Sequence, residues 1–134
     1  DNGYFVTCDF SNDINIPWVG KTKFKQYKKQ SSTDMLNQEK TSPDLILIDG
    51  RLQNDDLVLL ENLLSQNTII LLDDFEGSEK GVVNYMKLKK IEKLKTHFLI
   101  YPCERSKLEK FGENSYSTTA LMLPNNLIEL VAQG

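Results

Sequence analysis

The sequence predicts an α/β fold in a single domain, and three observations lead to that prediction. Short apolar runs recur at residues 44–50, 68–73 and 97–102. Segments with apolar residues at helical spacing follow the first two of these runs. The chain has 134 residues, of which 40% are hydrophobic and 26% charged, and this is enough apolar material for one core. Strands that alternate with helices are typical of a layered fold with a largely parallel sheet.

The first third of the chain has weaker signals. Residues 4–9 (YFVTCD) are rich in strand-forming residues and predict a strand. Pro17 and Gly20 exclude a helix in the segment that follows. Residues 23–27 predict a short strand, and one or two helical turns are expected from Ser32 on, with that serine as the cap.

The central part has the clearest pattern. Residues 44–50 (DLILIDG) form a continuous apolar run, as expected of a parallel strand covered on both faces. A helix capped by Asn54 or Asp55 should follow, with the leucine stripe Leu57, Leu60, Leu63 and Leu64. Residues 68–73 (TIILLD) then predict a second buried strand. A further helix capped by Ser78 should turn inward an apolar side made of Val82, Val83, Tyr85 and Met86.

The last two predicted strands are residues 97–102 (HFLIYP) and 116–124 (YSTTALMLP). Residues 103–115 between them are polar and contain Gly112. A parallel connection normally needs a crossover helix, which this segment does not clearly provide. An antiparallel pair joined by a long loop is therefore at least as well supported, and residues 125–134 predict a short final helix.

Charge and cysteine usage exclude several classes of function. The net charge of −3 provides no global basic field for nucleic acid, and the lysine-rich residues 20–29 and 87–95 fit solvated faces. No apolar run is long enough to span a membrane, and no signal peptide is visible. Cys8 and Cys103 lack metal-ligand or redox spacing, so they suit buried thiols in the cytoplasm. His97, the single histidine, is expected to be structural.

Acidic residues follow the predicted strands at the ends where ligands bind in an open α/β sheet. A carboxylate there can accept hydrogen bonds from ribose hydroxyls or bind a hard cation, and a neighbouring glycine lets a ligand approach the backbone. A single aspartate after a strand also suits a turn or a helix cap. Three acidic strand ends on one edge favour a ligand or metal role: Asp9-Phe10-Ser11, Asp49-Gly50-Arg51 and Asp73-Asp74-Phe75.

The segments PDLILIDGR and NTIILLDDFEGSEKGV, with a leucine-rich helix between them, resemble class I S-adenosylmethionine-dependent methyltransferases. The likeness is greatest to small-molecule O-methyltransferases, which carry IDG after the fourth strand and DDY or DDF after the fifth. It extends over residues 4–124 and is most specific at residues 43–77. The resemblance implies a Rossmann-like open, mostly parallel sheet with helices on both faces and a C-terminal antiparallel strand pair.

The resemblance also implies roles for individual residues. Asp9, followed by Phe10 and Ser11, matches the site that binds the ribose of S-adenosylmethionine. Three aspartates match the divalent-metal ligands of the metal-dependent members, which makes Mg²⁺ a candidate cofactor: Asp49, Asp73 and Asp74. Such a metal would lower the pKa of a substrate hydroxyl and orient it for methyl transfer. No residue is implied as the catalytic base, and the substrate is expected to be a small molecule.

The chain also departs from the family pattern, which leaves alternatives open. No strand with a glycine-rich loop precedes residues 4–9, so residues 1–134 are expected to form one methyltransferase-like domain that lacks this N-terminal part. An incomplete sheet would expose an edge strand, which favours pairing with a partner or an oligomer. A non-catalytic binding or interaction domain is one alternative. A response-regulator-like receiver domain, with Asp49 as phosphate acceptor, is the other, although Asp73 and Tyr101 stand where receivers carry Ser or Thr and Lys.

Overall fold

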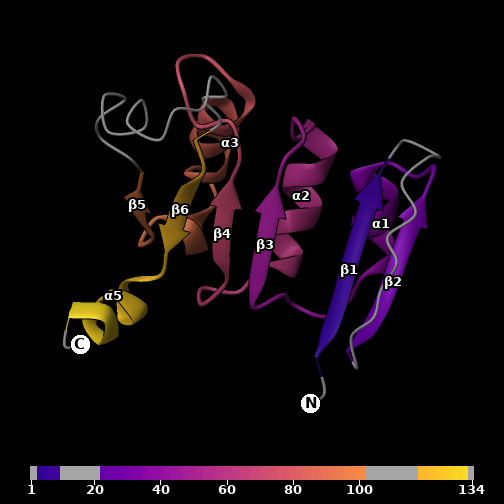
Figure 1. Ribbon diagram of the computed structural model, residues 1–134, viewed down its shortest axis with the longest axis horizontal. Coiled ribbons are helices and arrows are strands. Elements are labelled where there is room, and N and C mark those ends of the chain that lie inside the picture. Colours follow the sequence, from indigo (N-terminus) through magenta and orange to yellow (C-terminus); the bar gives the residue numbers. More distant parts are fainter. Residues whose placement is uncertain (1–2, 10–21, 102–117, 133–134) are drawn as a thin grey trace, which may run out of the picture.

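The computed structural model describes residues 3–9, 22–101 and 118–132, which form an α/β arrangement of strands and helices (Figure 1). The strands are β1 (Tyr4–Asp9), β2 (Lys23–Lys28), β3 (Leu45–Ile48), β4 (Ile69–Leu72), β5 (Phe98–Ile100) and β6 (Ala120–Leu123). The helices are α1 (Ser32–Gln38), α2 (Asn54–Leu63), α3 (Lys80–Leu88) and α5 (Asn125–Ala132), with a 3-10 turn, η1, at Glu92–Leu94. Within these ranges, no helix is both long and apolar enough to cross a membrane.

The strands form two small sheets. β1 pairs in parallel with β2, and a four-stranded sheet has the order β3-β4-β6-β5. β3 and β4 are parallel, whereas β6 runs antiparallel to both of its neighbours. The antiparallel pairing of the last two strands is therefore confirmed. β1 and β3 lie next to each other in Figure 1 but belong to different sheets, so one continuous Rossmann-like sheet stays a prediction.

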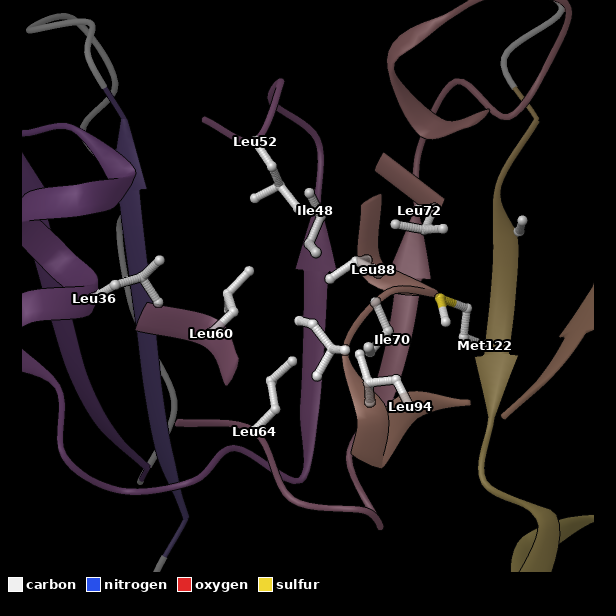
Figure 2. Packing of buried hydrophobic residues seen from close by; sticks show 12 residues of the cluster. Leu36, Ile48, Leu52, Leu60, Leu64, Ile70, Leu72, Leu88, Leu94 and Met122 are labelled. Atoms are coloured by element: carbon white, nitrogen blue, oxygen red, sulfur yellow. The ribbon is translucent and has the colours of Figure 1, made fainter. Parts of the chain in front are cut away.

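The hydrophobic core lies on one face of the four-stranded sheet. Strand register places Ile70 opposite Met122, and these side chains point with Ile48 and Leu72 toward leucines of α2 and α3 (Figure 2). Leu60 of α2 and Leu88 of α3 are 1% and 0% exposed. Alternation along a strand sends successive side chains to opposite faces, so each apolar run supplies both this core face and a second apolar face.

The second face of that sheet is partly open. Leu45 and Leu47 are 54% and 57% exposed, and Phe98 and Ile100 on β5 are 53% and 50% exposed. In Figure 1, α1, α2 and α3 all lie behind the strands, on the core side. The prediction that residues 44–50 are covered on both faces is therefore not met by the described part of the chain. The apolar run has the composition of a doubly covered strand, but within the described part of the chain α1, α2 and α3 all lie on the same side of the strands.

A buried aspartate links α1 to α2 and explains why the predicted caps are wrong. Asp56 is fully buried and accepts hydrogen bonds from the hydroxyls of Ser32 (3.1 Å) and Thr33 (2.7 Å). It also accepts one from the backbone N–H of Gln53, which is the N-cap of α2 in place of Asn54 or Asp55. Because the Ser32 hydroxyl is used in this link, Ser31 caps α1 instead. The predicted caps of both helices are therefore displaced by one or two residues from the observed ones.

Helix α3 turns inward a face that agrees only in part with the one predicted, because Tyr85 packs against the core as expected whereas Met86 does not. Its N-cap is Glu79 rather than Ser78, it begins at Lys80, and its buried residues are Gly81, Asn84 and Leu88. Met86, predicted on the apolar side, is 65% exposed. The prediction counted hydrophobic residues, whereas the helix places a small glycine and a hydrogen-bonded asparagine against the strands.

Candidate functional site

The acidic strand ends lie along one edge of the molecule. The arrowheads of β1, β2, β3 and β4 point the same way in Figure 1. Asp9 ends β1, Asp49 follows β3, and Asp73 and Asp74 follow β4, so all four belong to this edge. Phe10 and Ser11, predicted to bind the cofactor with Asp9, lie outside the described residues.

The turn after β4 has a constrained backbone. Asp74 has a φ of 49°, in the left-handed region that non-glycine residues rarely adopt. Gly81 of α3 lies so close that an added Cβ would be 2.4 Å from the carbonyl oxygen of Asp73 and 2.8 Å from that of Asp74. The Gly81 N–H donates to the Asp74 carbonyl at 3.2 Å. The first turn of α3 therefore contacts the backbone that carries the two aspartates. A strained backbone such as that of Asp74 is common at functional sites.

The residues just before β6 contact the same turn from its other side. The Phe75 N–H donates to the carbonyl of Thr118 at 2.7 Å, and the Thr118 hydroxyl donates to the carbonyl of Phe75 at 2.8 Å. The Phe75 ring packs edge-on against Tyr85 of α3, with 5.9 Å between ring centroids, and also contacts Tyr101. Backbone and aromatic contacts together fix the direction in which the Asp73-Asp74 segment leaves the sheet.

Asn84 plays a similar part for the loop after β3. This fully buried side chain donates to the carbonyl of Gly50 at 2.7 Å and accepts from the N–H of Leu52 at 3.0 Å. Lys87 donates to the carbonyl of Leu52 at 2.5 Å. Helix α3 thus supports both acidic loops, since its N-terminal turn contacts the β4 end and its middle binds the loop that begins with Asp49.

Asp49, Asp74 and Lys80 form a carboxylate–lysine cluster at this edge. The Lys80 ammonium donates to Asp49 Oδ1 at 2.6 Å and also contacts Asp74 Oδ2 at 3.1 Å. The side chain of Lys80 is 26% exposed, that of Asp74 31% and that of Asp49 65%. Hydrogen bonds to Asp49 and then to Asp74 raise the pKa of Lys80 well above its ordinary value, so its ammonium stays charged.

The three predicted metal ligands are near one another along the edge but do not face one point. Asp49 and Asp74 direct oxygens at Lys80, whereas Asp73 Oδ1 accepts from the hydroxyl of Thr119 at 3.2 Å. Across residues 3–9, 22–101 and 118–132, no group of three or more His, Cys, Asp or Glu side chains is arranged to hold a metal ion. As they stand, the described side chains do not fit a resident Mg²⁺, which prefers a near-octahedral shell of oxygen ligands.

His97 and Cys8 lie away from this cluster. His97 is buried, its Nε2 is 2.9 Å from the carbonyl oxygen of Thr68, and burial lowers the pKa of the imidazole. Cys8 is half-buried, and burial, followed by the carboxylates of Asp56 and Asp9, raises the pKa of its thiol. His97 has the structural environment expected of it, whereas Cys8 is half-buried rather than buried, and Cys103 lies outside the described residues.

Sequence reasoning found the acidic residues of this edge but missed Lys80, Gly81 and Asn84. Lys80 belongs to no apolar pattern, and a polar Asn84 on an amphipathic helix is expected to face solvent. No protein-family model, no curated protein and no solved structure matches the chain, so these comparisons assign it to no family.

Proposed function

We propose that this chain forms part of an S-adenosylmethionine-dependent methyltransferase that methylates a hydroxyl group of a small molecule. The observation that carries the proposal is the set of carboxylates at one edge, because an aspartate ends β1 there and aspartates directly follow β3 and β4. The antiparallel β6 between β4 and β5 gives further support, since the resemblance implies an antiparallel final pair.

In this proposal the two small sheets are parts of one Rossmann-like sheet. Figure 1 shows β1 beside β3 with the same direction, and Asp56 ties the helices behind them together. No ladder joins β1 to β3 among the described strands. The further strand that the resemblance implies would pair with the facing edges of β1 and β3. Its glycine-rich loop would then lie next to the acidic strand ends. Such a loop would complete the cofactor site.

The residues at the edge have distinct parts in the proposed reaction. S-adenosylmethionine supplies a methyl group bonded to a sulfonium sulfur. When bound, the cofactor would supply this methyl group to a substrate hydroxyl oxygen, with the electron pair of the broken carbon–sulfur bond staying on sulfur and the hydroxyl proton passing to water or a carboxylate. Asp9 would accept hydrogen bonds from the ribose hydroxyls. The loops that carry Asp49 and Asp74 would contact the substrate and position it.

Isothermal titration calorimetry with S-adenosylmethionine tests the proposal. We expect Asp9→Asn to weaken binding about tenfold to a hundredfold, because a hydrogen bond to a charged group contributes about 1.5–3 kcal/mol. The matched control is Asp44→Asn, since Asp44 is an exposed aspartate that precedes β3 and lies at the opposite edge. If the folded protein, tested together with the strand and glycine-rich loop that the proposal requires, shows no heat of binding with the cofactor, the proposed activity is wrong.

That negative result would favour the non-catalytic alternative, a methyltransferase-like domain that binds a partner. The partly open apolar face of Leu45, Leu47, Phe98 and Ile100 is the specific observation in its favour. The receiver alternative has less support, because the doubly wound sheet of receivers is parallel throughout, whereas β6 runs antiparallel between β4 and β5.

A further inference from the structure

The carboxylate–lysine cluster raises the question of which cation this edge holds. Asp49 and Asp74 come from the ends of two adjacent parallel strands, and a pair of carboxylates so placed would attract a positive ion. The side chain that meets them is Lys80, whose Nζ lies 2.6 Å from Asp49 Oδ1 and 3.1 Å from Asp74 Oδ2.

We propose that the ammonium of Lys80 is the resident cation of this edge and that it keeps divalent metal ions out. In the native chain, Asp49 and Asp74 are neutralised by this lysine and do not bind Mg²⁺ or Mn²⁺. The inference concerns cation binding alone, so it stands whether or not the chain binds S-adenosylmethionine.

The geometry supports exclusion of a metal. Both contacts of Lys80 are charge-assisted, and a divalent ion would have to displace the ammonium while replacing its own hydration shell. Two carboxylates and one ammonium leave a net charge of about −1, which attracts a divalent ion less than the two carboxylates alone. The Oδ1 atom of Asp73 accepts a hydrogen bond from the hydroxyl of Thr119 at 3.2 Å.

Backbone contacts of the neighbouring residue fix the position of the Lys80 backbone. Lys80 is the first residue of α3, and its neighbour Gly81 donates to the Asp74 carbonyl at 3.2 Å. A Cβ at Gly81 would lie 2.4 Å from the Asp73 carbonyl oxygen, so this helix end approaches the turn more closely than another residue would allow. The Cα of Lys80 is thereby held next to the aspartates, and its side chain, 26% exposed, has only a short distance to span.

The variant Lys80→Met tests the inference, because methionine keeps an unbranched side chain and removes the charge. Lys90→Met is the matched control, since Lys90 is an exposed lysine just after the same helix. The probe is Mn²⁺, whose electron paramagnetic resonance signal disappears from the free-ion spectrum on binding. We expect the Lys80→Met chain to bind Mn²⁺ at least about tenfold more tightly than the native chain or the control.

Two further measurements locate the effect. Adding Asp49→Asn to Lys80→Met should abolish the gained binding, because it removes one of the two facing carboxylates. Mn²⁺ should also raise the thermal midpoint of Lys80→Met while leaving the native midpoint unchanged. If Lys80→Met does not fold, Lys80→Gln is measured in its place.

Two results would overturn the inference. Native protein that binds Mn²⁺ as tightly as the Lys80 variant would show that the lysine does not exclude metal. A folded Lys80 variant that binds no Mn²⁺ would show that Asp49 and Asp74 do not converge on a cation position.

Discussion

Replacing Gly81 by alanine should destabilise the protein, although the same change usually stabilises a helix. Alanine is favoured over glycine in helices by up to about 1 kcal/mol. Here the new Cβ would lie 2.4 Å and 2.8 Å from two backbone carbonyl oxygens, of Asp73 and Asp74. Overpacking of this kind costs about 1–3 kcal/mol, and backbone yields less readily than a flexible side chain, so we take the upper part of that range. The net loss should be about 1–2 kcal/mol.

Urea unfolding followed by circular dichroism measures this loss, and the thermal midpoint should fall by about 4–8 °C. Gly50→Ala is the matched control, because no atom lies within 4 Å of a Cβ added there. That control should change the free energy of unfolding by no more than about 0.5 kcal/mol. A Gly81→Ala protein as stable as the native chain, or more stable, would refute the close approach of α3 to the strand end.

Three other substitutions test separate parts of the fold. Asn84→Leu should lower the free energy of unfolding by about 2–4 kcal/mol in urea, because it removes the partner of the Gly50 carbonyl and the Leu52 N–H. Asp56→Asn should cost about 1–3 kcal/mol in thermal unfolding, because one acceptor oxygen in a buried group of donors becomes an amide donor. The thermal midpoint of the native protein should fall as the pH drops below about 6.5, because burial lowers the pKa of His97 in the folded state and the unfolded chain therefore binds the proton first. The variant His97→Gln should show a smaller change of thermal midpoint with pH. An unchanged pH dependence in this variant would contradict the prediction.

Much of the secondary structure could be predicted because its signals are local. The runs DLILID and TIILLD became β3 and β4, and the leucine spacing of residues 57–64 became α2. The polar segment between the last strands made an antiparallel pair at least as well supported as a parallel one, the resemblance implied it, and it is confirmed. The ends of the helices were less predictable. The cap of α1, for example, depends on a hydrogen bond from the Ser32 hydroxyl to Asp56, which is distant in sequence.

The candidate site divides in the same way. The sequence by itself determined that an aspartate ends β1 and that aspartates follow β3 and β4, since a carboxylate at the end of a strand-forming run is visible in the order of residues. Only the tertiary structure decided that Lys80 lies between Asp49 and Asp74 and that Asp73 turns to Thr119. The physical reason is that a strand end is a local property, whereas the partner of a charge depends on which helix the packing of Gly81 and Asn84 brings against it.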